Sequence, residues 1–304
     1  MTFQQLKYVI EVARSRSISK AAQNLFISQP SLSNSIKELE KEMGITIFSR
    51  TNKGIIITPE GSEFLGYARQ VLEQAELLEN RYAQNSSQQQ FAVSSQHYAF
   101  AVSAFVRLLQ DYNREEYEFT LRETKTYEII DDVTNLRSEI GILYLNGFNE
   151  KVISKFLREG NLVFQQLFEA KPHVFISSNN PLAQQDYVTL ADLEPYPYLS
   201  YEQGEYNSFY FSEEILSTLT RLKNIRVTDR ATLFNLLIGL NGYTISTGVI
   251  SKELNGENII SVPLQVDERI TVGYITHKHV VQSPMAKIYI ELLHETIADE
   301  ISQI

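Results

Sequence analysis

Apolar residues recur every three or four positions in three successive segments at the start of the chain, over residues 3–13, 18–25 and 32–43. This is the spacing of helices that each bury one side, so three packed helices are predicted, with Ser19 as the N-cap of the second. Two apolar runs follow, 45–48 and 55–57, on either side of a polar tip that contains glycine, which is typical of two short paired strands. Residues 1–58 are therefore predicted to form a winged helix-turn-helix, a domain whose third helix can enter the major groove of DNA.

The third predicted helix has a polar side that suits DNA. Ser28 is expected to cap it, and Pro30 stands in its first turn, where a missing N–H breaks no hydrogen bond. With the apolar stripe packed inward, Gln29, Ser33 and Lys37 line up on another side. The side chains of this helix and of the wing that can reach base edges or phosphates are Ser28, Gln29, Pro30, Ser31, Ser33, Asn34, Lys37, Arg50 and Lys53. An ordinary three-helix bundle with a solvated polar face remains the alternative.

A long helix with a narrow apolar seam is predicted next. Thr58, Pro59 and Glu60 supply an N-cap, a proline at the first helical position and an acid near the positive end of the helix. Apolar residues then recur at alternating intervals of four and three at Phe64, Ala68, Val71, Ala75, Leu78 and Tyr82. So narrow a seam is typical of a helix that pairs with another helix, and we expect it to join two subunits. The polar run 83–90 marks a domain boundary and ends a linker over 59–90.

Strands and helices alternate over the rest of the chain. Apolar runs predict strands at 91–93, 117–122, 140–145, 163–167, 173–177, 198–201, 225–227 and 243–246. Helical spacing predicts helices at 99–112, 127–136, 208–219, 232–240 and 284–301. This alternation is that of parallel sheets with crossover helices, so the predicted fold class is α/β.

Composition narrows the class of protein further. The chain has no cysteine, which excludes disulfides, thiolate nucleophiles and cysteine-ligated metals, and no apolar run approaches the ~20 residues of a membrane span. No secretory signal is apparent at its start, so the expected location is the cytoplasm. The net charge is -10, yet residues 1–60 hold eight Lys or Arg against five Asp or Glu. A mildly basic head therefore precedes an acidic body.

Patterns typical of enzymes and metal sites are missing from the sequence. It has no glycine-rich phosphate loop, no G-x-S-x-G elbow and no histidine pair at the spacing of a helical metal site. His277 and His279 share a strand face without a carboxylate cluster beside them, and His97, His173 and His294 are isolated. We therefore expect no catalytic activity, no cofactor and no metal.

Residues 17–61 resemble the N-terminal signature of LysR-type transcriptional regulators. The shared features are the paired alanines Ala21 and Ala22, the Ser-Gln-Pro opening of the third helix, Leu39-Glu40, Phe48, Arg50, and Thr58 with Gly61. The Asn-Pro-Leu-Ala motif at 180–183 and the GLNGYTIS segment at 239–246 extend the resemblance along the chain. Family members often carry Arg where this chain has Asn34, so the base preference of relatives is not carried over.

The resemblance implies three parts with different tasks. The head would read promoter DNA, the linker helix would pair subunits into a homodimer or homotetramer, and residues 91–304 would form a two-lobed domain of the periplasmic-binding-protein type that senses a small molecule. The lobes would comprise about 91–163 with 268–304 and about 164–267, with crossing segments at 163–167 and 264–270. RNA polymerase would be a partner of an activator, and no membrane partner is expected. The alternative is a cytosolic small-solute-binding protein of the same two-lobed fold without operator specificity.

A two-lobed fold holds its ligand in the cleft where strand ends meet helix N-termini. The strand at 91–93 runs into Ser94, Ser95 and Gln96 directly before a helix, and hydroxyl, amide and free N–H groups there suit a carboxylate. Relatives use this loop for the effector, and it resembles that of sulfur-amino-acid regulators, whose effectors are acetylated serine derivatives. The further candidates at matching positions are Thr124, Thr126, Tyr144, Ser200, Tyr201, Gln203 and Thr247. Capping and turn roles for these residues remain the alternative.

Overall fold

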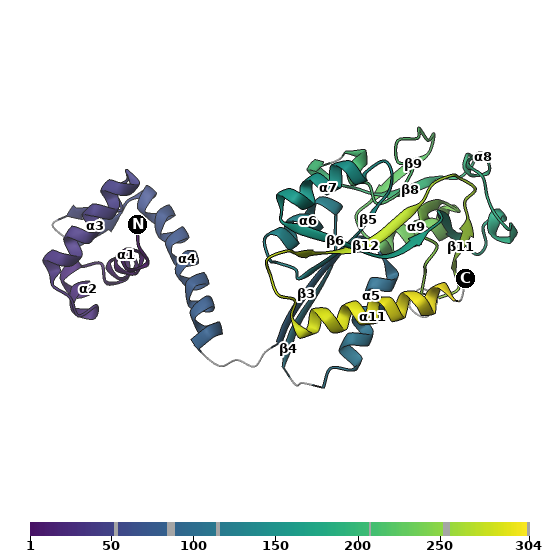
Figure 1. Ribbon diagram of the computed structural model, residues 1–304. Coiled ribbons are helices and arrows are strands. Elements are labelled where there is room, and N and C mark those ends of the chain that lie inside the picture. The colour runs from purple at the N-terminus through teal and green to yellow at the C-terminus, as the bar shows by residue number, and fades with distance from the viewer. Residues whose placement is uncertain (52–53, 84–88, 114–115, 207, 252–255, 303–304) are drawn as a thin grey trace. The chain divides into compact units, whose positions relative to one another are not determined.

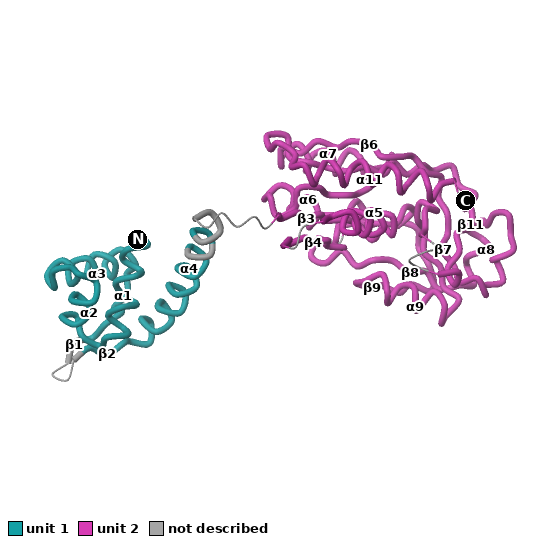
Figure 2. Tube along the Cα trace, turned by 90° about the horizontal axis from the view of Figure 1, so that it is seen from below, with its two compact units in different colours: residues 1–87 teal, residues 88–304 magenta. Residues whose placement is uncertain are grey.

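A computed structural model describes residues 1–51, 54–83, 89–113, 116–206, 208–251 and 256–302. The chain folds into two compact units, Met1–Ser87 and Gln88–Ile304 (Figure 2). The division falls within the polar run predicted as the boundary, of which residues 84–88 lie outside the described ones. Among the residues described, no helix is long and apolar enough to cross a membrane.

The first unit is the predicted winged helix-turn-helix followed by a long helix (Figure 1). Its elements are α1 (Phe3–Ser15), α2 (Ile18–Asn24), α3 (Gln29–Met43), β1 (Phe48–Thr51), β2 (Gly54–Ile57) and α4 (Pro59–Ala83). The Ser28 hydroxyl accepts a hydrogen bond from the N–H of Ser31 (3.2 Å), so the predicted cap of α3 is confirmed. The cap of α2 is Ser17 rather than Ser19, because that helix already begins at Ile18.

The start of α4 is fixed to the backbone just before the wing. The hydroxyl of Thr58 accepts a hydrogen bond from the N–H of Gly61 (2.9 Å), and the N–H of Thr58 donates to the carbonyl oxygen of Ile47 (3.1 Å). Gly61 packs so closely here that a Cβ at its position would lie 2.3 Å from the same Ile47 oxygen. Glycine is therefore required at this contact, which sets the direction in which α4 leaves the head.

The second unit contains two five-stranded sheets, and each sheet forms the centre of one lobe. The first sheet has the order β4-β3-β5-β12-β6 and the second the order β11-β7-β10-β8-β9. The strands are β3 (Gln89–Ser95), β4 (Tyr117–Glu123), β5 (Ile140–Leu145), β6 (Leu162–Ala170), β7 (His173–Ser177), β8 (Tyr198–Tyr201), β9 (Asn224–Val227), β10 (Tyr243–Ser246), β11 (Ile259–Pro263) and β12 (Ile270–His277). Both sheets are mixed, not wholly parallel as the alternation suggested, because β12 runs antiparallel to β5 and β6, and β7 antiparallel to β10 and β11.

Helices cover both faces of the first sheet (Figure 1). The helices of this unit are α5 (Ala99–Gln110), α6 (Thr126–Thr134), α7 (Glu150–Glu159), α8 (Leu190–Leu193), α9 (Arg230–Leu240) and α11 (Pro284–Ile301), with 3-10 turns η1 (Pro181–Gln184), η2 (Gly204–Tyr206) and η3 (Phe209–Phe211). Side chains alternate along β5, so Ile142 joins the core under α5 and α11 while Leu143 joins the core under α6 and α7. The N-termini of α5 and α6 follow strands of this sheet and point polar groups toward the second lobe.

The lobes are divided later in the chain than the sequence analysis predicts. Because β6 pairs with β12 along its whole length, residues 163–167 belong to the first sheet, and the crossing lies at Lys171–Pro172. The return crossing runs through 264–269, between β11 and β12, as predicted. The first lobe thus contains β3–β6 and β12, and the second contains β7–β11.

The helix predicted at 208–219 does not form. Phe211 and Ile215 would lie on one side of such a helix, yet they are buried in different cores, Phe211 with α6 and α7 and Ile215 in the core that joins the lobes. Leu216 has a φ of 58°, which a helix does not permit. Contacts with distant parts of the chain therefore override the helical spacing in this segment.

Candidate functional site

The polar face of α3 is exposed in the isolated head. Gln29, Pro30, Asn34 and Lys37 are exposed, as are the capping residue Ser28 and its partner Ser31. Ser33 is the exception among the predicted DNA-facing residues, since it is only 8% exposed. It follows Leu32, and its place at the edge of the buried stripe turns it toward the core. The remaining face combines an amide pair with one lysine.

The two strands of the wing form as predicted, but the side chains predicted to contact DNA there lie outside the described residues. Arg50 lies in β1 and pairs with Ile55 of β2, while its side chain lies outside the described residues. Lys53 lies wholly outside them. The proposed contacts of Arg50 and Lys53 with phosphates therefore stay predictions.

The apolar seam of α4 serves two different purposes along its length. Ala68 is buried and Phe64 packs against the core of the head, so the start of the seam is not available to a second subunit. Farther along, Val71 is 41% and Leu78 60% exposed, and Ala75 between them is half-buried. The side chain of Tyr82 lies outside the described residues. The part of the seam that remains uncovered thus begins at Val71.

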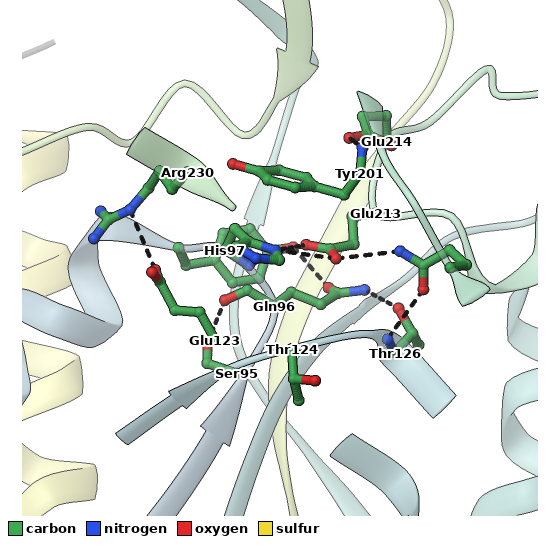
Figure 3. Close-up of polar contacts among 12 residues, drawn as sticks. Ser95, Gln96, His97, Glu123, Thr124, Thr126, Tyr201, Glu213, Glu214 and Arg230 are labelled. Carbon is green, nitrogen blue, oxygen red and sulfur yellow. Dashed lines mark hydrogen bonds and ion pairs between the residues drawn. The ribbon is translucent and has the colours of Figure 1, made fainter. Parts of the chain in front are cut away.

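In the second unit, some of the predicted effector residues gather around Gln96 (Figure 3). The amide nitrogen of Gln96 donates to the hydroxyl of Thr126 (2.6 Å), and its amide oxygen accepts from the N–H of Tyr144 (3.1 Å) and from the hydroxyl of Tyr98 (3.1 Å). Gln96 is buried, so all of these bonds are shielded from water. The loop after β3 is thereby tied to the starts of α5 and α6 and to the end of β5.

Side chains of the second lobe complete this cluster. The N–H of Thr126, the first residue of α6, donates to the amide oxygen of Gln203 (3.2 Å), and the Gln203 amide nitrogen donates to Glu213 Oε1 (3.2 Å). The N–H of His97 donates to Glu213 Oε2 (3.0 Å), and Nδ1 of the same histidine lies 2.9 Å from that oxygen. The side chains of His97 and Glu213 are each only 5% exposed. Glu213 is thus a buried carboxylate that receives hydrogen bonds from both lobes.

Ionisable groups line the rest of the cleft. Tyr201 stacks on the ring of His97 with 3.8 Å between centroids, and Arg230 Nε lies 3.3 Å from Glu123 Oε1. Burial lowers the pKa of His97, but the charge and hydrogen bond of Glu213, with Glu123 behind it, raise that pKa, and the net shift is upward. Burial acts in the opposite direction on carboxyl groups. It raises the pKa of Glu123, and it raises the pKa of Glu214 by more. Glu214 also accepts a hydrogen bond from the N–H of Tyr201 (2.9 Å).

Little empty space remains among these side chains. A cavity of about 30 Å³, room for about two water molecules, is bordered by His97, Tyr201, Glu213, Arg230 and residues of β10. The lobes are therefore closed on each other in this structure, and protein groups fill the middle of the cleft.

The two serines after β3 have other partners. Ser94 lies on the opposite side of the strand from Ser95, and its hydroxyl donates to the buried carboxylate of Asp132 (2.6 Å), which also binds Arg122 and Arg137. The hydroxyl of Ser95 donates to the carbonyl oxygen of Gln96 (2.6 Å). Ser94 thus contributes to the packing of α6 and is left out of the site proposed below.

The remaining candidates are spread around the cleft. The hydroxyl of Tyr144 donates to the carbonyl oxygen of Ser212 (3.0 Å), while the hydroxyl of Thr124 donates to Glu128. Thr247 is buried and accepts from the N–H of Val249 (3.3 Å), as a turn residue does. Ser200 is half-buried on β8. Of this group, Tyr144 is the one joined to the Gln96 cluster.

Sequence reasoning missed the ionisable half of the site. His97 follows the predicted effector loop directly, but its partner Glu213 stands 116 residues later, and Arg230 is likewise remote in sequence from its partner Glu123. The sequence held one signal of this half of the site, because two adjacent acids, Glu213 and Glu214, stand in a largely apolar segment. Within the described residues, no group of three or more His, Asp or Glu is placed to hold a metal ion.

Comparison with known proteins extends over both units. Residues 3–62 match the family model of the bacterial regulatory helix-turn-helix proteins of the lysR family, and residues 91–298 match that of the LysR substrate binding domain. Among curated proteins, the transcriptional regulator YnfL of Escherichia coli is 26% identical over 294 residues, which cover 93% of this chain and 94% of that protein. The transcriptional regulator OxyR of Escherichia coli is 22% identical over 286 residues, which cover 90% of this chain and 89% of that protein.

A solved structure shows the same fold along the full length. A mutant of OxyR from Corynebacterium glutamicum superposes with a TM-score of 0.52 at 17% identity, covering 99% of this chain and 94% of that one. Since the substrate-binding model alone matches more than half of the chain, the chain belongs to the LysR family. It is a DNA-binding transcriptional regulator with an effector-binding domain, not an enzyme.

The ionisable groups of the cleft make the stability of the second unit dependent on pH. A histidine with a raised pKa contributes its full stability below the unfolded value of about 6.5 and loses it as the pH rises through the folded pKa. The raised pKa values of Glu123 and Glu214 act in the same direction from lower pH upward. We expect the Tm to fall between about pH 6 and about pH 8, and to fall less in a His97→Gln variant, as calorimetry can measure. The exposed His294→Gln is the control, and equal slopes for His97→Gln and the parent would contradict this coupling.

Proposed function

We propose that this regulator binds promoter DNA in the cytoplasm through the exposed face of α3 and the wing, as a homodimer or homotetramer joined through α4. A small carboxylate held between the lobes controls it, and RNA polymerase is a partner where it activates transcription. The observation that carries the proposal is the exposed polar face of α3 on a basic head, in a chain whose net charge is -10. Gln29 and Asn34 supply amides for base edges, and Lys37 supplies a charge for phosphate.

The effector site that we propose comprises Gln96, His97, Thr126, Tyr201 and Gln203. It is supported by their convergence from both lobes and by the donors that His97 and Gln203 direct to the carboxylate of Glu213. A ligand that touches both lobes can favour one arrangement of them, and thereby of the DNA-binding heads, by as much as its affinities for the two arrangements differ.

Loss of Lys37 should weaken binding to every DNA sequence. A Lys37→Ala variant is expected to lower affinity for a promoter fragment and to reduce the slope of log K against log salt by about one, because one phosphate contact is lost. Lys7→Ala removes the same charge from an exposed position on α1 and is the matched control. Fluorescence anisotropy at several salt concentrations measures both. An unchanged slope for Lys37→Ala would reject this face of α3.

A charge in the uncovered part of the α4 seam should separate subunits. Val71→Asp places an unpaired carboxylate where a second helix is expected, so the oligomer should dissociate to smaller species and operator binding should weaken with it. Gln70→Asp adds the same charge at the neighbouring exposed position and should change neither property. Light scattering on the eluted species measures the mass, and an unchanged mass for Val71→Asp would exclude the seam.

A ligand of the cleft should depend on Gln203. Amino acids and their acylated derivatives, acetylated serines among them, can be screened by thermal shift, and a compound that stabilises the parent should bind Gln203→Ala at least about tenfold more weakly. The reason is that a hydrogen bond to a charged group contributes about 1.5 to 3 kcal/mol. Gln110→Ala, at the far end of α5, should bind like the parent. Equal affinity of Gln203→Ala by calorimetry would move the ligand elsewhere.

A further inference from the structure

A segment of the second lobe is embedded in the first. We name residues 202–206 and 208–214 the strap. They follow β8, include η3 and lie in the connection to β9, and both of these strands belong to the second sheet. The ring of Tyr206 stacks on Tyr127 with 3.5 Å between centroids. Phe211 is buried in the core of α6 and α7, 5.3 Å from the ring of Phe156. The strap therefore holds the two lobes together through aromatic contacts of its own.

Polar contacts continue this attachment along the strap. Glu202 pairs with Lys125 of the first lobe (3.2 Å), and Ser212 accepts the hydrogen bond of Tyr144 described above. Glu213 follows and reaches the loop before α5. The strap thus contacts the first lobe at several positions between Glu202 and Glu213.

The carboxylate of Glu213 lies beside His97, just before the start of α5. The N-cap residue of this helix, Tyr98, makes no side-chain capping bond. Just before it, three donors converge on Glu213: the N–H and ring of His97 from the first lobe and the amide of Gln203 from the second. Three donors around one buried carboxylate are a strong anion position, because such bonds carry a charge and are shielded from water. The adjoining cavity of about 30 Å³ is too small for an effector beside it.

We propose that Glu213 is a built-in occupant of the carboxylate position, so that a carboxylate effector binds by displacing it and releases the strap from the first lobe. This inference rests on the effector site proposed above and adds the mode of regulation. An incoming carboxylate replaces the bonds that Glu213 gives up, so the rest of the ligand decides its net affinity. The apparent affinity is reduced by the fraction of molecules in which the strap is already released.

Chemical rescue tests whether the position accepts a free carboxylate. Glu213→Ala leaves the donors of His97 and Gln203 without their carboxylate, and the full chain should lose about 3 to 6 °C in Tm. Sodium acetate, as the probe, should recover part of this loss in proportion to the logarithm of its concentration, because it binds only the folded protein. Sodium chloride at equal ionic strength should not. Glu205→Ala, an exposed acid of the same strap, and the parent should respond to acetate no more than to chloride.

Glu213→Gln provides the second arm, because it keeps the shape of the side chain and fills the position. Its Tm should not respond to acetate beyond chloride, and the pKa of His97 measured by NMR should fall, since burial remains and the carboxylate is gone. An acetate effect equal to that of chloride in Glu213→Ala, or a His97 pKa unchanged in Glu213→Gln, overturns the proposal. Promoter binding by the parent is measured alongside, because its absence contradicts the proposed function while the acetate result concerns Glu213 alone.

Discussion

The carboxylate of Glu213 is withdrawn from water, and a buried charge is stable only where hydrogen-bond donors or an opposite charge replace its hydration. In this chain the replacement comes from two lobes at once, His97 on one side and Gln203 on the other. Each donor is fixed by a further contact, His97 by the ring of Tyr201 and Gln203 by the N–H of Thr126. Closure of the lobes is consequently a single cooperative arrangement, because opening it would leave several charged and polar groups without partners together.

Local periodicity accounts for the parts of the fold that could be predicted from the sequence. The stripes of α1 to α3 and the strand at 243–246 depend on the spacing of neighbouring residues, and the structure forms them there. The segment 208–219 has helical spacing too, but Phe211 finds its partners in Tyr127 and Phe156, which no local pattern contains. Tertiary contacts therefore override local propensity in that segment. The predicted lobe boundary near residue 164 was wrong for a similar reason, because β6 pairs with β12, a strand that lies about 100 residues later in the chain.

The candidate site divides in the same way. Gln96, Thr126 and Gln203 could be named because they stand where strands end and helices begin, and they do converge. Ser94 could not be distinguished from Ser95, since adjacent residues of a strand point to opposite faces and only the position of Asp132 decides which face is which. The pairing of His97 with Glu213 leaves no trace in spacing at all, because ion pairs between separate elements are set by the tertiary fold.

The packing of Gly61 against the Ile47 carbonyl fixes the first turn of α4 to the DNA-binding head, so this helix acts as a rigid arm. Its 25 residues, at 1.5 Å per residue, extend about 38 Å. A tilt of about 5° at one end of such an arm displaces the other by about 3 Å, close to the rise of one base pair, about 3.4 Å. In a dimer joined through α4, the crossing angle of two such arms would set the separation of the two recognition helices to within a single base step. The side chains of Val71, Ala75 and Leu78 in the uncovered seam would in such a dimer bear on which operator spacing it can read.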